Sequence, residues 1–362
     1  MAAGISMNTY SELDVEGYER VVRCDNDVVG FTAWAAIHDT TLGPALGGCR
    51  LWNYTNEEEA FTDVLRLSRG MTYKNALAGL ALGGGKSVVR GDPQKIDRRA
   101  LFENFGRFVD YLGGVYITAE DVNVTLADME VVARQTAHVA TVGASGNPSP
   151  FTAFGVYCAL QAAAAHVFGS DDLSGLRVAI QGIGETGGRL AELLAGAGCK
   201  IAAADINEDN INRLRQKIEF ERVEPEHIID ADCDIFSPCA LGGILNVETI
   251  ARLRCRIVGG SANNQLLHER DGEELLRRNI LYIPDFAANA GGVINISCEI
   301  GHVYDPQKAR EKTAAIGNCI KRIIDISTRD KLPTNRVAIA LAEEVIVASK
   351  DGSSPKTSSA PR

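Results

Sequence analysis

The sequence predicts an α/β protein of two domains, the second of which is built on a doubly wound parallel sheet. Three observations predict this fold class. The chain has 362 residues, which is enough for two domains. From about residue 174, short apolar segments alternate with helical ones, as in a parallel sheet with crossover helices. Before that region, GASGNPSP (143–150) is typical of an interdomain linker. We therefore expect domains at 1–146 and 147–327, and a disordered polar tail at 350–362.

The composition excludes several classes of protein. The formal net charge is −10 and the isoelectric point is about 5.2, whereas nucleic-acid-binding domains usually carry a basic face. No stretch approaches a membrane-spanning apolar run, and residues 1–20 do not resemble a signal peptide. The nine cysteines include no Cys-x-x-Cys, which indicates free thiols in a reducing compartment, and the histidines are isolated. We expect a cytoplasmic protein without nucleic-acid, membrane or metal partners.

The first domain begins with two strands, predicted in residues 19–40 around an Asp-Asn-Asp turn. Residues 55–79 predict a helix that starts with Thr55 and Glu58 at the spacing of a capping box, and Lys74 lies at or just beyond its end. The apolar stripe of this helix consists of Ala60, Val64, Leu67 and Met71.

A second helix is predicted at residues 98–112. Its inward face is formed by Leu101, Phe105, Phe108, Val109 and Leu112. A short apolar strand at 115–118 then runs into Glu120 and Asp121. Carboxylates just past the C-terminal end of a buried strand lie where α/β proteins place their chemistry, although a solvated loop acid is the alternative.

The segment GLALGGGKSVV (79–89) places Lys86 after three glycines and before a serine. A phosphate-binding loop requires a glycine, four residues and then Gly-Lys-Ser or Gly-Lys-Thr, but the position required for that first glycine is Leu80. The spacing therefore disfavours a nucleotide hydrolase. We expect the three glycines to permit close approach of neighbouring groups, and Lys86 to have a different role.

The strongest local pattern is a dinucleotide-binding motif. A strand leads into Gly182-x-Gly184-x-x-Gly187, a helix follows, and a second strand ends at Asp205, next to Ile206. The three glycines allow, in order, the tight turn, the approach of a pyrophosphate and the packing of helix against strand. The helix N-terminus favours phosphates, and the aspartate would accept hydrogen bonds from ribose hydroxyls and repel a 2′-phosphate. We therefore predict NAD rather than NADP, with Ile206 as a further cofactor contact.

Small residues and amides follow three later strands, in SPCALGG, GSANNQL and PDFAANAGG. These segments contain Ala240, Asn263, Asn264 and Asn289. The carboxyl edge of a parallel sheet is where the nicotinamide half of the cofactor is expected. A single loop asparagine is usually a turn residue, but sets of them at successive strand ends disfavour that explanation.

Lys74, Lys86 and Asp121 together suit an amino acid or a 2-oxo acid as substrate. One lysine would hold the α-carboxylate as a point charge. The other, partly buried and crowded by a like charge, would have a lowered pKa and would act as the general base that activates water against an imine. The aspartate would hold the substrate ammonium and relay a proton. Either lysine alone would be explained more simply as a surface residue.

Seven motifs occur along the chain: LGPALGGCR, RGMTYKNALAGLALGGGKSVV, YITAEDV, GNPSPFTAFGVY, GIGETGG, SANNQL and PDFAANAGGVIN. Through them, the chain from about Gly30 to Ser327 resembles the amino-acid dehydrogenases that act on leucine, valine, phenylalanine and glutamate, and most closely those for leucine and valine. The resemblance implies an N-terminal substrate domain completed by a C-terminal helix at about 328–349, a Rossmann NAD domain that closes over the cleft between them, and a homo-oligomer.

The resemblance also implies roles for matching residues. Lys86 resembles the catalytic lysine, and Asp121 resembles the catalytic acid that handles the amine. The residues that resemble substrate contacts are Lys74, Asn264, Gly47 and Gly48. The residues that resemble NAD contacts are Thr152, Gly182, Gly184, Gly187, Asp205, Ala240, Asn263 and Asn289.

Four positions match the family's side-chain pocket, and all are apolar: Leu46, Ala119, Val293 and Ile296. Glutamate would need a cation for its distal carboxylate, because an unpaired buried charge is very costly, and the family's glutamate enzymes have a lysine at the position of Leu46. The bulk of Val293 and Ile296 limits the room for an aromatic ring. We therefore predict reversible, NAD-dependent oxidative deamination of leucine, valine and isoleucine, with broad activity, since one methylene is worth only about 1–3 kcal/mol.

Three alternatives remain. Asn123 stands where leucine enzymes usually have glycine and resembles the phenylalanine enzymes, so aromatic substrates are the second prediction. A 2-hydroxy-acid dehydrogenase would share the nucleotide-binding domain, but no histidine here lies in a glycine-rich or strand-end motif. A non-catalytic NAD-binding protein is disfavoured because Lys74, Lys86 and Asp121 are all present.

Overall fold

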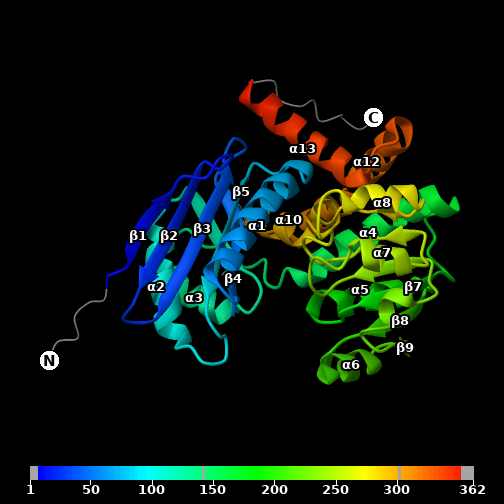
Figure 1. Ribbon diagram of the computed structural model, residues 1–362, viewed down its shortest axis with the longest axis horizontal. Helices are drawn as coiled ribbons and strands as arrows, with labels where there is room; N and C mark the ends of the chain where they lie inside the picture. The colour runs from blue at the N-terminus through cyan, green and yellow to red at the C-terminus, as the bar shows by residue number, and fades with distance from the viewer. Residues whose placement is uncertain (1–6, 141–142, 301–302, 352–362) are drawn as a thin grey trace. The chain divides into compact units, whose positions relative to one another are not determined.

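The computed structural model describes residues 7–140, 143–300 and 303–351 (Figure 1). Contacts divide the chain into two units, Met1–Gly146 with Glu343–Arg362, and Asn147–Ala342. The first division falls inside the Gly- and Pro-rich stretch expected to be a linker. The second passes through the last helix, α13 (Thr334–Lys350), and not through residue 327. Most of the expected tail, residues 352–362, lies outside the described residues.

The first unit is built on a six-stranded mixed sheet with the order β1-β2-β3-β5-β4-β6. Its strands are β1 (Thr9–Leu13), β2 (Arg20–Asn26), β3 (Phe31–Asp39), β4 (Ala45–Trp52), β5 (Gly83–Arg90) and β6 (Tyr116–Glu120). β1, β2, β3 and β5 pair antiparallel, whereas β4 pairs parallel with both β5 and β6. The two strands expected in residues 19–40 are confirmed as β2 and β3.

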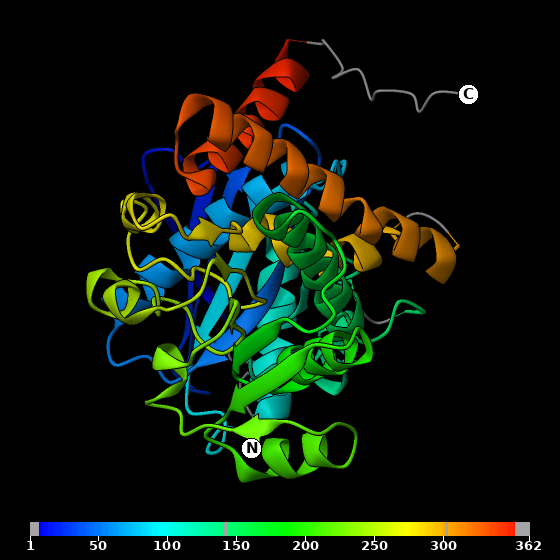
Figure 2. The same cartoon turned by 90° about the vertical axis from the view of Figure 1, so that its right-hand side faces the viewer.

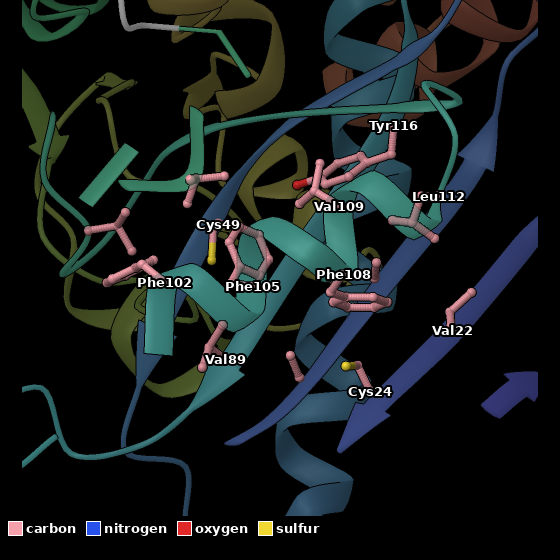
Figure 3. Close-up of a cluster of buried hydrophobic side chains, with 14 of the residues drawn as sticks. Val22, Cys24, Cys49, Val89, Phe102, Phe105, Phe108, Val109, Leu112 and Tyr116 are labelled. Atoms are coloured by element: carbon pink, nitrogen blue, oxygen red, sulfur yellow. The ribbon is translucent and has the colours of Figure 1, made fainter. Parts of the chain in front are cut away.

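Alternation along the strands gives this sheet two apolar faces. Helix α1 (Glu57–Leu77) covers one face, where its Ala60 and Val64 meet a set that includes Val21, Trp34, Ala36 and Val88. Helices α2 (Arg98–Tyr111) and α3 (Leu126–Ala133) contribute to the core on the other face, which includes Val22, Ala33, Ala35 and Val89. Figure 3 shows the phenylalanines of α2 in this second core. Because Val88 faces α1, the alternation also directs Lys86 towards α1.

The start of α1 differs from the sequence prediction by one residue. The N-cap is Asn56, whose side chain accepts from the Glu59 N–H at 2.8 Å, and the Glu59 carboxylate accepts from the Thr55 N–H at 2.9 Å. The capping box predicted for Thr55 and Glu58 is therefore wrong, because asparagine caps as well as threonine does and lies one position later. Lys74 belongs to the last turn of the helix and does not lie beyond it.

The second unit contains a parallel sheet with the order β12-β11-β10-β7-β8-β9. Its strands are β7 (Arg177–Gln181), β8 (Lys200–Ala204), β9 (Glu221–Arg222), β10 (Ile235–Pro238), β11 (Ile257–Val258) and β12 (Leu281–Tyr282). Every neighbouring pair is parallel, as the alternating pattern predicted. The strand order reverses at β7, which lies between β8 and β10, and such a switch point is where α/β sheets bind ligands.

Figure 2 shows strands β7 and β8 of this parallel sheet in green, with helices of the second unit around the sheet. They are α4 (Ser149–Phe168), α5 (Glu185–Gly196), α6 (Glu208–Arg215), α7 (Val247–Arg252), α8 (Asp271–Arg277), α9 (Asp285–Ala288), α10 (Gly291–Ser297), α11 (Pro306–Ala314) and α12 (Ile316–Asp330), with a short 3₁₀ turn at Ile228–Asp230. Helices α11 and α12 follow one another closely and are separated at Ala315.

Helix α4 corrects one expectation from the sequence. Within the described part of the chain, it is the one helix long and apolar enough, by length and composition alone, to cross a membrane. The expectation that no stretch approaches such a run is therefore wrong. In the second unit α4 packs against α5, α10 and α12, which is the environment of a helix in the interior of a fold.

Candidate active site

The glycine-rich segment around Lys86 forms strand β5, and Lys86 is 4% exposed. A Cβ on Gly84 would lie 2.0 Å from Thr72 Oγ1 of α1, and one on Gly83 would lie 2.3 Å from the Asp39 carbonyl oxygen. On the opposite face, a Cβ on Gly85 would lie 2.8 Å from Tyr116 Cδ2. The glycines thus let neighbouring elements pack against the strand that carries Lys86, and the expectation of close approach is confirmed.

Lys86 forms a buried ion pair with Asp121. The distance from Lys86 Nζ to Asp121 Oδ2 is 2.7 Å, and the aspartate directly follows β6. Gly48 permits this approach, because a Cβ there would lie 2.4 Å from the Glu120 carbonyl oxygen and 2.8 Å from Asp121 Cβ. Gly47 is equally confined, since its Cβ would lie 1.8 Å from the Gly85 carbonyl oxygen. The sequence prediction that Lys86 and Asp121 act together therefore has a direct geometric counterpart.

A second cation, Arg50 of β4, binds the same carboxylate. Arg50 Nε lies 3.3 Å from Asp121 Oδ2. Burial by itself would raise the pKa of the Asp121 carboxyl, but the Lys86 ammonium and the Arg50 guanidinium outweigh it and hold that pKa well below its usual range. Asp121 is therefore an anion throughout the neutral range. Sequence reasoning missed Arg50. Its neighbours Cys49 and Leu51 belong to the core on the α2 side of the sheet, so alternation directs Arg50 to the opposite face, which is the face of Lys86.

The remaining candidate residues of the first unit lie on the same side of the sheet. Lys74 is 9% exposed and belongs to the last turn of α1, the helix that packs over this face. Leu46 of β4 and Ala119 of β6 are buried, and alternation places both on the face of Lys86. Cations, an anion and apolar side chains therefore share one face of the sheet, on or next to its parallel strands β4, β5 and β6.

The glycines of the dinucleotide motif have the three geometries that a pyrophosphate site requires. Gly182 has φ 87°, and a Cβ there would lie 2.7 Å from Ala240 Cβ. A Cβ on Gly187 would lie 2.0 Å from the Gly182 carbonyl oxygen, so this glycine is needed for helix packing. Gly184 is the N-cap of α5, without a side-chain cap, and a Cβ on it would meet only Asn210 Nδ2, at 4.0 Å. The space above Gly184 therefore fits a dinucleotide phosphate.

Asp205, at the end of β8, has an oriented carboxylate. It accepts hydrogen bonds from the Ile183 N–H at 2.8 Å, the Asn207 N–H at 2.8 Å and Asn210 Nδ2 at 3.1 Å. A carboxylate offers about four acceptor positions, so these contacts leave room for a ribose hydroxyl. The adjacent Ile206 is 91% exposed, which is unusual for an apolar side chain and suits a residue that a ligand covers.

The asparagines after β11 and β12 form a connected group. Asn289 Nδ2 donates to Asn263 Oδ1 at 2.8 Å, while the buried Asn289 Oδ1 has no partner. Asn264 has φ 51°, and its N–H donates to Asp285 Oδ2 at 2.6 Å. Sequence reasoning missed Asp285, although it stands in PDF, the first residues of a quoted motif. An unpartnered buried acceptor is a place where a cofactor amide can bind.

Three predicted residues lie on helices of the second unit. Thr152 of α4 donates its hydroxyl to the Pro148 carbonyl at 3.2 Å, and a Cβ on Gly292 would lie 2.7 Å from that hydroxyl. Val293 and Ile296 of α10 are buried and three residues apart, so they share one helix face. Among the described residues, no group of three or more His, Cys, Asp or Glu side chains could hold a metal ion.

A parallel sheet with a dinucleotide motif, in a chain that also has a buried lysine–aspartate pair, is typical of an oxidoreductase that uses a nicotinamide cofactor. Comparison with known proteins makes the class more specific. Residues 15–138 match the Glu/Leu/Phe/Val dehydrogenase dimerisation domain, and residues 204–315 match the Glutamate/Leucine/Phenylalanine/Valine dehydrogenase domain.

Relatives cover almost the whole chain. It is 48% identical to a leucine dehydrogenase of Thermoactinomyces intermedius over 94% of each chain, and 41% identical to a valine dehydrogenase of Streptomyces virginiae over 93% of this chain and 96% of the relative. The crystal structure of L-tryptophan dehydrogenase from Nostoc punctiforme is similar with a TM-score of 0.76 and 40% identity, over 92% of this chain and 97% of that chain. The chain belongs to the Glu/Leu/Phe/Val dehydrogenase family, and it is an amino-acid dehydrogenase.

Proposed function

We propose that the protein catalyses the reversible, NAD-dependent oxidative deamination of leucine, valine and isoleucine to 2-oxo acids and ammonia. The observation that carries this proposal is the buried Lys86–Asp121 pair, 2.7 Å apart, in a chain that is 48% identical to a leucine dehydrogenase. In the forward direction, an L-amino acid, NAD⁺ and water give a 2-oxo acid, ammonium, NADH and a proton.

The bound nicotinamide supplies one step, the acceptance of hydride from the substrate Cα. The chain supplies the rest. Lys74 holds the substrate carboxylate as a point charge. Asp121, held ionised by its two cations, binds the substrate ammonium. It would also relay a proton in this proposal. Lys86 acts as the base that activates water, and the tetrahedral adduct then releases ammonia. The Gly47 and Gly48 backbone and Asn264 are further substrate contacts in this proposal.

The proposed pocket residues favour a branched aliphatic side chain. Leu46 and Ala119 are apolar and buried, and Val293 and Ile296 are the two further pocket residues of this proposal. Asn123, the reason to consider aromatic substrates, has φ 58° and donates Nδ2 to the Leu51 carbonyl at 3.1 Å. Asparagine and glycine are the residues that tolerate this conformation best, so backbone geometry accounts for Asn123 without an aromatic substrate.

A substrate panel tests the reaction. Formation of NADH at 340 nm is expected to be fastest with L-leucine, L-valine and L-isoleucine, slower with L-phenylalanine and absent with L-glutamate, whose distal carboxylate would be unpaired. The reverse reaction with the 2-oxo acid is expected to require ammonium. Faster oxidation of L-phenylalanine than of any aliphatic substrate would favour the aromatic alternative. Reduction of the 2-oxo acid without ammonium would indicate a 2-hydroxy-acid dehydrogenase.

The choice of NAD over NADP is proposed to depend on Asp205. Asp205→Asn keeps the shape but removes the charge that repels a 2′-phosphate, so the ratio of the NADPH to the NADH dissociation constant is expected to fall by about tenfold or more. The matched control is Asp209→Asn, which makes the same charge change at an exposed position of α6. Titration of cofactor fluorescence measures both constants. An unchanged ratio in Asp205→Asn would contradict this role.

Further NAD contacts and an assembly are part of the same proposal. Thr152, Ala240, Asn263, Asn289 and Ile206 are proposed to line the cofactor site. We also propose a homo-oligomer, because residues 15–138 match a domain described as a dimerisation domain. A cytoplasmic location is proposed because the cysteines are free thiols.

A further inference from the structure

Arg50 and Lys86 compete for one oxygen atom. Lys86 Nζ lies 2.7 Å from Asp121 Oδ2, and Arg50 Nε lies 3.3 Å from the same oxygen. The mechanism proposed above requires Lys86 to lose a proton, but a carboxylate as close as Asp121 favours the charged amine. A second cation on that oxygen weakens this attraction and repels the ammonium directly.

Arg50 is fixed from its other side. Its Nη1 lies 2.9 Å from Asp63 Oδ2 of α1, and the Tyr54 hydroxyl donates to the same oxygen at 2.6 Å. Burial, and then the charge of Asp63, raise the pKa of Tyr54 far above its usual range, so the phenol stays a neutral donor. Tyr54, Asp63, Arg50, Asp121 and Lys86 therefore form one continuous chain of charge-assisted contacts.

The setting makes these contacts strong and gives them direction. The side chains of Arg50 and Asp121 are each 18% exposed, so solvent and salt screen them little. A guanidinium is planar and can bind two carboxylates in fixed directions, whereas an ammonium is a point charge. Asp63 therefore holds Arg50 in position, and Arg50 in turn holds Asp121 in position.

We propose that Arg50 is a positioning residue for the lysine–aspartate pair: anchored by Asp63 and Tyr54, it holds Asp121 and takes part of its charge away from Lys86, so that Lys86 can release its proton. This inference rests on the proposed function, in which Lys86 is the base. To the crowding of Lys86 by Lys74, expected from the sequence, it adds a second cation at a stated distance.

Other titratable or charged side chains also surround the pair. Besides Arg50, Asp63 and Tyr54, they are Cys49 of β4, Tyr116 and Glu120 of β6, and Lys74 of α1. Burial raises the pKa of the Cys49 thiol to about 12, and it also raises the pKa of the Tyr116 phenol, so both stay neutral in the neutral range. Burial and then the Asp121 charge raise the pKa of Glu120. Of these seven, Arg50 is a cation that pairs with Asp121 Oδ2, at 3.3 Å, and this shared oxygen makes it the residue to change.

The first test is the pH dependence of kcat/KM for L-leucine. In Arg50→Met, Asp121 pairs with Lys86 and no longer with a guanidinium, and the positive charge that repelled the Lys86 ammonium is gone. The ascending limb of the profile is therefore expected to move about one pH unit or more to higher pH. The kcat at pH 7 is expected to be lower. In Arg50→Lys, the ascending limb is expected to lie between those of the unaltered protein and Arg50→Met, because lysine keeps the positive charge but lacks the planar guanidinium that binds two carboxylates. If Arg50→Met folds poorly because Asp63 is left unpaired, Arg50→Met with Asp63→Asn removes both charges and serves instead.

The matched control is Arg23→Met. Arg23 of β2 also bridges two carboxylates, at 2.7 Å to Asp25 and 2.6 Å to Glu57, the first residue of α1. In the sheet, β3 and β5 separate its strand from β4, which carries Arg50. It is expected to change stability without moving the pH profile. An unshifted limb in folded Arg50→Met, or an equal shift in Arg23→Met, would overturn the proposal.

A second readout does not need turnover. The pH at which Lys86 becomes reactive towards acetic anhydride, followed by mass spectrometry of its peptide, is expected to rise by the same amount in Arg50→Met. If the unaltered protein oxidises no amino acid, the proposed function fails, but this labelling still tests whether Arg50 acts on Lys86. Identical labelling curves in the two proteins would overturn the positioning role whatever the enzyme's substrate.

Discussion

Lys86→Ala is expected to lower kcat with L-leucine by about 10³-fold or more while NADH still binds with an unchanged dissociation constant, because a positioned general base contributes about 10²–10⁴-fold. The dinucleotide motif belongs to the second unit, so its strands and glycines are not touched by the change. Asp121 keeps Arg50 as a partner at 3.3 Å, which limits the cost of leaving a buried carboxylate unpaired.

Lys86→Arg separates proton transfer from charge. An arginine can still pair with Asp121, but a guanidinium is always protonated and cannot act as a base, so kcat is expected to fall as far as in Lys86→Ala. Lys95→Ala is the matched control, because Lys95 lies in the same unit with its side chain 81% exposed. Stopped-flow absorbance at 340 nm measures turnover, and NADH fluorescence measures binding. Turnover within tenfold of the unaltered enzyme in Lys86→Arg would show that Lys86 serves as a charge and not as a base.

The sequence could predict those parts of the fold in which each residue carries a local reason for its place. Gly182, Gly184, Gly187 and Asp205 each have a separate steric or electrostatic task, so their spacing alone identified the motif that the structure contains. The parallel sheet followed from apolar segments that alternate with helices. Three glycines mark the position of Lys86. They are needed because a side chain at any of them would clash with a neighbouring element, and such a run of glycines can be recognised in the sequence.

What the sequence could not predict depends on contacts between distant segments. Arg50 and Asp121 are far apart in the chain and meet only because β4 pairs with β6. Asp285 and Asn264 meet in the same way across the ends of two strands. The N-cap of α1 was misplaced because Thr55 and Asn56 are both good caps, and only the fold decides between them. The sequence alone also cannot show that Asn123 has a positive φ of 58°, which explains the residue without reference to a substrate.

Gly84→Ala is expected to destabilise the first unit by about 3 kcal/mol or more, because its Cβ would lie 2.0 Å from Thr72 Oγ1 and 2.1 Å from the Thr72 backbone nitrogen. Backbone atoms of a helix cannot yield as the end of a flexible side chain can. Either α1 must move away from β5 or the strand must bend. Both movements would displace Lys86, two residues further along β5, so the remaining folded protein is also expected to turn over more slowly.

Gly70→Ala makes the same chemical change, but it is expected to stabilise the first unit where Gly84→Ala destabilises it. Gly70 lies within α1, and a Cβ there would meet nothing within 4 Å, so the variant is expected to gain up to about 1 kcal/mol from helix propensity alone. Both tryptophans of the chain, Trp34 and Trp52, belong to the first unit, so their fluorescence during urea unfolding reports on that unit and not on the second. A Gly84→Ala midpoint equal to that of Gly70→Ala would mean that α1 does not pack against β5 as closely as these distances require. In that case the glycine triplet would need an explanation outside packing, and contact with substrate is the one that its neighbour Lys86 suggests.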